Sequence, residues 1–299
     1  MPTELLIASV TEGTLLLCGV LSLWRCALSP AARAKASGSQ PLPFWHILGY
    51  IFGFTALRVI CVALGVQILT SALIKRLHPD LSLTEGYGLF VSSMVFQCSI
   101  LLGVAVGWWL LKPSRFFAEL NASTSNEPPS PPRLAWSKVP IAAFATFTII
   151  LCVVTLVSLL WQWVLGQMGR PATSQDAAKL FQQADSVPYI LLLLLLAVVV
   201  APLMEELIFR GGIFRYLRGR LPRRIAFLLP SIFFAALHDN LIVVALPLVI
   251  FGVIQCFAYE RTGRIAVPIV AHGLFNLHTA VLILAEIDLY SFLQSTPGP

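Results

Sequence analysis

The chain has 299 residues, of which 58% are hydrophobic and only 11% are charged. Its mean hydropathy of +0.84, together with several uncharged runs near the ~20 residues that a helix needs to cross ~30 Å of hydrocarbon, excludes an ordinary water-soluble domain. The net charge of +6 does not indicate a nucleic acid partner, because most basic residues lie in short segments between apolar runs, as in the cytoplasmic loops of membrane proteins.

Eight apolar runs are candidate membrane spans, and they predict an all-α fold that is a polytopic transmembrane helical bundle. The runs lie at residues 5–24, 45–74, 87–111, 139–165, 187–210, 224–239, 241–259 and 265–286. The sixth run is short for a membrane crossing. We expect a three-span membrane region of unknown role at 1–112, a Pro- and Ser-rich cytoplasmic linker at 113–138, and a membrane domain that carries the chemistry at 139–290.

The basic residues predict the orientation of these spans, since short loops rich in Lys and Arg stay on the cytoplasmic side. Of the 20 Lys and Arg residues, 15 follow the odd-numbered spans, four follow the even-numbered ones, and Arg58 lies inside the second span. Arg58 is either a buried partner for a carboxylate or a snorkelling side chain. Both termini are therefore expected to face away from the cytoplasm, across the plasma or inner membrane if the chain is bacterial.

The fifth span ends in a group of charged residues, which are energetically costly so close to a long apolar run. The run Val187–Met204 contains no charged residue, but the next six residues read EELIFR. A carboxylate close to hydrocarbon loses its hydration, so it must be compensated or used. On a helix with 100° per residue, Glu206 and Arg210 lie side by side and are expected to pair, whereas Glu205 points about 100° away. Glu205 is therefore expected to face the bundle interior as a candidate general base.

Two further patterns place polar side chains on later spans. In FAALH, from Phe234 to His238, the four-residue spacing puts the phenyl ring and the imidazole on one helical face, where the phenyl ring can fix the orientation of the imidazole. In HGLFN, from His272 to Asn276, the same spacing projects an imidazole and a carboxamide together from the last span. Two polar donors on an apolar helix indicate a shared purpose.

Each of these features also has a purely structural interpretation. A Glu–Arg pair is often a simple ion pair at a helix end, and a histidine inside the membrane, such as His278 or His46, is often a hydrogen-bonded packing residue. The basic run at 215–224 is most simply interpreted as an anchor for anionic lipid headgroups. Function is favoured by the conjunction of a glutamate, two histidines and an asparagine on three spans of one bundle, where uncompensated polarity is costly.

The three patterns resemble, in order, the EExxxR, FxxxH and HxxxN motifs of the CPBP family, the CAAX-protease and bacteriocin-processing (Abi) intramembrane glutamic endopeptidases, which are type II CAAX prenyl endopeptidase-like. The resemblance covers residues 188–286, with 33 residues from Glu205 to His238 and 34 from His238 to His272. It implies a helical membrane fold with its active site inside the bundle. It also implies hydrolysis of a peptide bond without a covalent intermediate.

By motif position, the resemblance implies that Glu205 and His238 activate a water molecule, while His272 and Asn276 stabilise the oxyanion. The supporting residues are Glu206, Arg210 and Phe234. This scheme uses no metal and no cofactor. The expected partners are a protein or peptide substrate, which can be membrane-anchored, and membrane lipid, but no nucleic acid.

Two other functions stay open on the residues alone. Glu205, His238 and His272 could form a His₂Glu zinc set, which would make the chain a zinc-dependent membrane protease. Alternatively, the polar cluster could bind a peptide without cleaving it, as in an immunity or transport protein. The sequence does not name the substrate or say whether it is prenylated.

One geometric conflict follows from the span boundaries. Glu205 lies near the cytoplasmic end of its span, but His238 lies near the far end of the next one, ~20 Å of helical rise from Arg224. We expect the helix of Glu205 to continue past Arg210 and the following span to be tilted or partly re-entrant. The site would then lie a third to halfway into the bilayer and open toward the cytoplasm.

Overall fold

The computed structural model describes residues 3–28, 134–170, 176–182, 184, 186–218, 221–238 and 241–285, together with 72–79 and isolated positions between 65 and 102. Within these ranges every regular element is a helix, and no strand occurs among them. The prediction of an all-α fold is therefore confirmed.

Within the described part of the chain, five helices are long and apolar enough to cross a membrane, and each overlaps a predicted span. They are Ile7–Cys26, Trp136–Gln167, Val187–Phe214, Ile242–Thr262 and Ala266–Leu284. The predicted runs at 45–74 and 87–111 lie largely outside the described residues, as do Arg58 and most of the linker at 113–138. The chain is thus a polytopic helical membrane protein, and its division at residues 112 and 138 stays a prediction.

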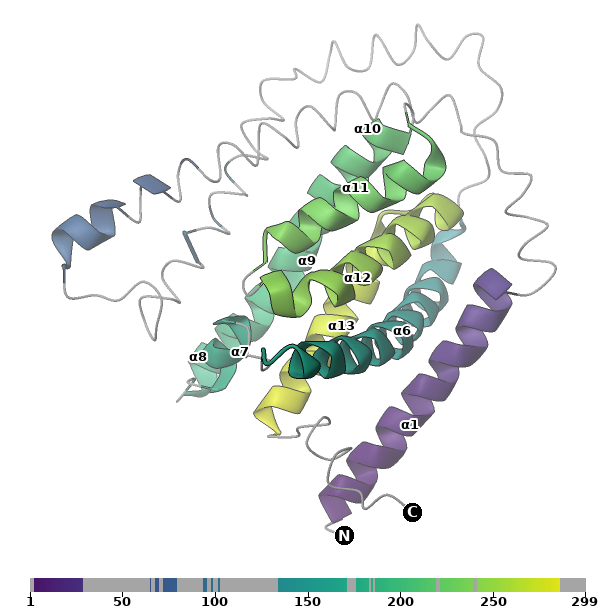
Figure 1. Cartoon of the computed structure of the whole chain (residues 1–299), viewed down its shortest axis with the longest axis horizontal. Helices are drawn as coiled ribbons and strands as arrows, with labels where there is room; N and C mark the ends of the chain where they lie inside the picture. Colours follow the sequence, from purple (N-terminus) through teal and green to yellow (C-terminus); the bar gives the residue numbers. More distant parts are fainter. Residues whose placement is uncertain are drawn as a thin grey trace, which may run out of the picture. The chain divides into compact units, whose positions relative to one another are not determined.

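One compact unit contains residues 1–40, 132–175 and 227–299. Its longest helix packs against three others (Figure 1): α6 (Val139–Gln167) against α1 (Thr3–Leu23), α12 (Leu241–Thr262) and α13 (Ala266–Leu284). A core of small and medium apolar side chains joins α6, α12 and α13, and it consists of Val139, Ala143, Ala258 and Val267. Small side chains let helix backbones approach closely, which favours dispersion contacts where lipid removes the hydrophobic driving force.

Helix α1 approaches α6 at a glycine. A β-carbon on Gly19 would lie 2.2 Å from the carbonyl oxygen of Thr148 and 2.6 Å from the Cβ of Cys152, so only glycine fits there. Close by, the hydroxyl of Thr148 lies 3.4 Å from that of Ser22. The two helices are therefore in direct backbone contact at this crossing.

The turn between α12 and α13 is fastened to the start of α6. Gly263, with φ of 62°, ends α12 in the left-handed conformation that suits a glycine cap. The Nε of Arg264 donates to the carbonyl of Leu134 at 2.7 Å, and its guanidinium lies 4.4 Å from the centre of the Trp136 ring, in η3 (Trp136–Lys138). The backbone N–H of Leu134 in turn donates to the carbonyl of Thr262 at 3.0 Å. These contacts hold the α12–α13 hairpin against the entry to α6.

Helix α11 (Arg223–Ala236) has 14 residues, which gives it a length of about 21 Å, less than the ~30 Å of a hydrocarbon core. The predicted span extended to residue 239, but Leu237 and His238 form a turn after the helix. Within the first unit α11 meets α12 closely, since a β-carbon on Gly252 would lie 2.7 Å from the Cβ of Ser231. His238 is therefore presented at the end of a short helix.

The second compact unit contains residues 41–131 and 176–226. Within it, α7 (Asp176–Gln182) precedes a helical path that is continuous from Val187 to Arg218. The path consists of α8 (Val187–Leu194), η4 (Leu195–Val200), α9 (Ala201–Glu206), η5 (Leu207–Phe214) and α10 (Arg215–Arg218). The helix of Glu205 therefore continues past Arg210, as predicted.

Two segments of this path, η4 and η5, are π-helical. The first ends two residues before Pro202, whose ring crowds the carbonyl of Val198 and removes a backbone donor. The wider π-helical turn relieves that crowding. The second begins immediately after Glu206, so both glutamates lie on the short α-helical segment α9. Single π-helical turns are rare overall, but those that occur are frequently found at functional sites.

Candidate active site

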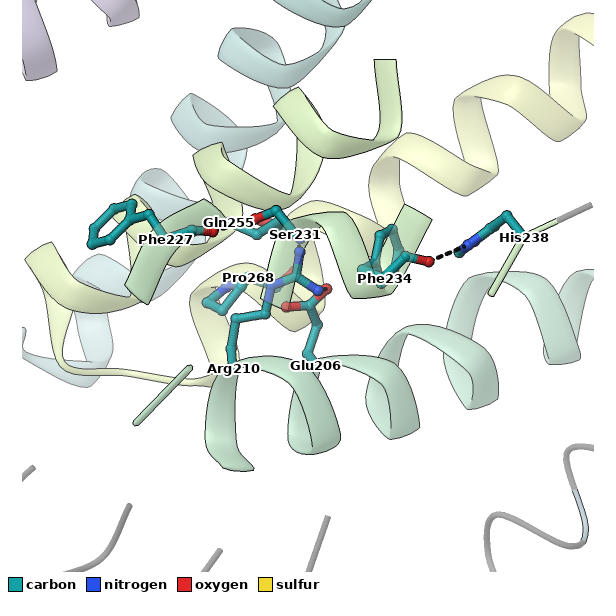
Figure 2. A network of polar contacts seen from close by, with 8 residues as sticks. All are labelled: Glu206, Arg210, Phe227, Ser231, Phe234, His238, Gln255 and Pro268. Atoms are coloured by element: carbon teal, nitrogen blue, oxygen red, sulfur yellow. Dashed lines mark hydrogen bonds and ion pairs between the residues drawn. The ribbon is translucent and has the colours of Figure 1, made fainter. Parts of the chain in front are cut away.

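Glu206 and Arg210 form the predicted ion pair. Arg210 Nη1 lies 3.0 Å from Glu206 Oε1, and the side chains point toward each other from consecutive turns (Figure 2). Both are buried, at 0% and 1% exposure. Two charges lose their hydration at this depth, so the pair holds only because each charge offsets the other. The i, i+4 spacing predicted this contact correctly.

Glu205, the neighbouring carboxylate, has different surroundings. It lies on the same α-helical segment, but its side chain is partly exposed, whereas that of Glu206 is fully buried. The difference follows from the helix, because consecutive residues point about 100° apart. Of the two glutamates, Glu205 is therefore the more accessible.

Phe234 and His238 are joined as the second motif predicted, with ring centroids 4.6 Å apart. In addition, His238 Nδ1 lies 2.8 Å from the backbone carbonyl oxygen of Phe234 (Figure 2). A carbonyl can only accept a hydrogen bond, so Nδ1 must carry the proton in this contact. In the neutral imidazole the other ring nitrogen, Nε2, then keeps its lone pair.

His272 is buried between phenyl rings from two other helices. Its ring stands edge-on to Phe251 of α12, with centroids 4.7 Å apart and an interplanar angle of 68°, and edge-on to Phe234 of α11 at 6.1 Å. Phe234 and Phe251 are themselves stacked at 5.7 Å. Because Phe234 contacts both His238 and His272, the second and third motifs converge on one aromatic cluster.

Asn276 follows His272 by one turn on the uninterrupted helix α13, so the two polar side chains share a face. Asn276 is partly exposed, whereas His272 is only 4% exposed. A buried donor beside a more accessible one is suited to hydrogen-bonding a substrate oxygen that enters from the accessible side. Phe275, between them in sequence, packs on Phe251 at 5.4 Å.

The structure thus gathers the motif residues into two groups, one in each compact unit. The first group contains both histidines, Phe234 and Asn276, and the second contains both glutamates and Arg210. Within the described residues no set of three His, Cys, Asp or Glu side chains is arranged to hold a metal ion. A zinc site made from Glu205 and the two histidines would need ligands from both units.

Sequence reasoning missed two residues beside this site. Phe251 lies on an apolar helix where nothing distinguished it from other core residues. Gln255 is fully buried one turn later, and its Nε2 donates to the carbonyl of Pro268 at 2.9 Å. A lone carboxamide in an apolar span was a usable signal, because an unmatched polar group there is costly.

His278 is placed as the sequence suggested, as a hydrogen-bonded residue outside the motifs. Its Nε2 contacts Glu12 Oε1 of α1, and its ring lies 6.1 Å from that of Phe147 on α6. The contact therefore ties the first helix of the chain to the helix that carries His272. His46 lies outside the described residues.

Two helices of membrane-crossing length carry the first and third polar motifs, and the shorter helix α11 leads into the second. These features define a class of protein, the helical membrane proteins with polar residues in their spans. Residues 187–278 match the family described as type II CAAX prenyl endopeptidase Rce1-like, which agrees with the resemblance that the three motifs carry. Glu205, His238, His272 and Asn276 all lie inside the matched segment.

One curated relative is the protein of Bacillus subtilis (strain 168) named "Putative membrane peptidase YdiL". It is 32% identical over 123 residues, which make up 41% of this chain and 49% of the relative. The match thus spans about half the length of that relative. No solved structure matches the chain.

Proposed function

We propose that the protein is an intramembrane endopeptidase in which Glu205 and His238 activate a water molecule. The contact between His238 Nδ1 and the Phe234 carbonyl, at 2.8 Å, carries this proposal. It fixes the tautomer and the ring orientation, and it leaves Nε2 as an acceptor for a water proton. A held ring with an available lone pair can orient a water molecule whose proton goes to the general base, Glu205.

In the proposed reaction the water oxygen attacks the carbonyl carbon of the peptide bond, and the Glu205 carboxylate takes one water proton. His238 Nε2 accepts a hydrogen bond from the same water and orients it. The substrate carbonyl becomes an oxyanion, to which His272 and Asn276 donate hydrogen bonds. When the tetrahedral intermediate collapses, the C–N bond breaks and the proton passes from Glu205 to the leaving amine.

The surroundings of His272 support its role as a donor. Its ring is packed edge-on between Phe251 and Phe234, which excludes water and holds the imidazole in one orientation. A fixed donor in a low-dielectric site stabilises developing charge more strongly than the same donor in water. Similarity to an endopeptidase family and to a relative named as a membrane peptidase supports a protein or peptide as the substrate.

The test uses purified protein in lipid vesicles, incubated with membrane proteins from the source cell, with new peptide termini identified by mass spectrometry. We expect cleavage by the wild type and by Glu260→Gln, a matched glutamate change at the end of α12, but none by Glu205→Gln. Equal cleavage by the Glu205 variant would reject the proposed mechanism. A third outcome is that the wild type and the Glu205 variant both bind a peptide and neither cleaves it. In that case the chain is a peptide-binding protein instead.

A further inference from the structure

Helices α12 and α13 make two contacts that lie one turn apart along each helix. From the first contact to the second, the residue number falls on α12 and rises on α13, as in an antiparallel pair. Gln255 Nε2 donates to the carbonyl of Pro268 at 2.9 Å, and the ring of Phe251 packs on that of His272 at 4.7 Å. On each helix the two contacting residues are four positions apart, so each pair occupies a single face. The hydrogen bond and the ring contact therefore belong to one register of an antiparallel helix pair.

The two contacts differ in how strongly they specify that register. Ring contacts and aliphatic packing, such as that of Ala258 with Val267, tolerate a small slide of one helix along the other. A fully buried carboxamide does not, because a donor withdrawn from its acceptor in an apolar interior costs free energy that no water recovers. Fixing the register of a helix is the best-attested role of a single buried polar group.

The acceptor lies directly next to the candidate site. The carbonyl of Pro268 is one helical turn before His272, at the position where an α-helix accepts the N–H of His272. We propose that Gln255 is a positioning residue that sets the register of α13 on α12 and thereby places His272 for hydrogen bonding to the oxyanion. This inference rests on the proposed endopeptidase function.

The main test compares Gln255→Met, which keeps the length of the side chain but removes the donor, with Thr146→Val. Thr146 is a matched control, because its buried hydroxyl donates to a carbonyl, that of Ala142, but within one helix. We expect Gln255→Met to lower kcat about tenfold, equivalent to one mispositioned donor. KM should stay within about twofold, and Thr146→Val should retain wild-type kcat. Wild-type kcat in folded Gln255→Met overturns the inference.

A double-mutant cycle separates positioning of His272 from general loosening of the fold. If Gln255 acts through His272, the Gln255→Met change should have little further effect on kcat in a His272→Ala background. An undiminished tenfold effect in that background would show that Gln255 acts elsewhere. If Gln255→Met does not fold, Gln255→Asn retains polarity but withdraws the donor by one methylene and should show the same loss. Failure of both variants to fold would reject a positioning role in favour of a purely structural one.

A second readout does not depend on proteolysis. His272 is 4% exposed, so its carbethoxylation by diethyl pyrocarbonate, measured by mass spectrometry, should be slow in the wild type and several-fold faster in Gln255→Met. Thr146→Val should react like the wild type. If the wild type cleaves nothing, the proposed function fails, whereas equal carbethoxylation of wild type and Gln255→Met means that the register inference fails.

Discussion

The two neighbouring glutamates should respond differently to the same substitution. Glu206 is fully buried against Arg210, so Glu206→Gln leaves a buried guanidinium without its carboxylate. Breaking a buried pair from one side typically costs ~3–5 kcal/mol. We expect the thermal midpoint in detergent to fall by roughly 6–20 °C, while Glu205→Gln unfolds near the wild-type temperature.

The double variant Glu206→Gln/Arg210→Met is the control for that prediction. It removes both charges, so most of the lost stability should return. A wild-type midpoint for Glu206→Gln, together with a large loss for Glu205→Gln, would mean that the two glutamates have been assigned the wrong way round.

Asn276 and metal removal together distinguish the metal-free mechanism from the zinc alternative. Both mechanisms can use Nε2 of His238, but a carboxamide is a poor zinc ligand, so Asn276 has a role only as an oxyanion donor. We expect activity to survive EDTA or phenanthroline and Asn276→Ala to lower kcat by ~10²–10³. Inactivation by chelator that added Zn²⁺ reverses, with a nearly active Asn276→Ala, would instead establish the zinc enzyme.

Contacts within one helix could be predicted from the sequence, and contacts between helices could not. The Glu206–Arg210 pair follows from a spacing of four residues on a continuous helix. The Phe234–His238 contact was expected from the same spacing, although His238 lies in the turn just after α11. Gln255 with Pro268 depends on the rotation and register of two helices. Apolar periodicity indicates that these helices are buried, but it does not fix which residues face each other.

At the scale of helices, the crossing of α1 and α6 makes a prediction with an internal control. A β-carbon on Gly19 would overlap the Thr148 carbonyl, but one on Gly13 of the same helix meets nothing within 4 Å. We expect Gly19→Ala to destabilise the protein by about 1–3 kcal/mol through overpacking. Gly13→Ala should be neutral or stabilising by up to ~1 kcal/mol, because alanine favours the helix. Thermal unfolding of both variants provides the measurement, and equal midpoints would mean that α1 does not pack at Gly19.

The helix boundaries show where hydropathy is informative. The predicted spans 139–165 and 265–286 agree closely with Val139–Gln167 and Ala266–Leu284, because apolar composition and helix length coincide there. The fifth span was predicted to end at residue 210 with its helix continuing beyond, and the helix does continue through charged residues to Arg218. Charges mark where a helix meets water or a partner, and they do not end the helix itself.

Across the whole chain, the first helix is linked to the helix that carries the third motif. Glu12 contacts His278, and Gly19 lies against Thr148, so α1, α6 and α13 belong to one compact unit. Helix α1 nevertheless lies outside the segment that matches the endopeptidase family. The N-terminal span therefore packs in the same compact unit as the helix that carries His272 and Asn276.

The distribution of basic residues predicts the orientation of the chain in the membrane, and thiol labelling can test it. Fifteen of the 20 basic residues follow odd-numbered predicted spans, which predicts that the 113–138 linker lies in the cytoplasm and residue 176 outside. In a background without the six native cysteines, an impermeant maleimide applied to intact cells should label Asp176→Cys but not Ser125→Cys. Both should react after the cells are permeabilised, which shows that each thiol is accessible. Labelling at 125 with protection at 176 would invert the topology and place the basic loops outside, against the bias that short Lys- and Arg-rich loops show in membranes.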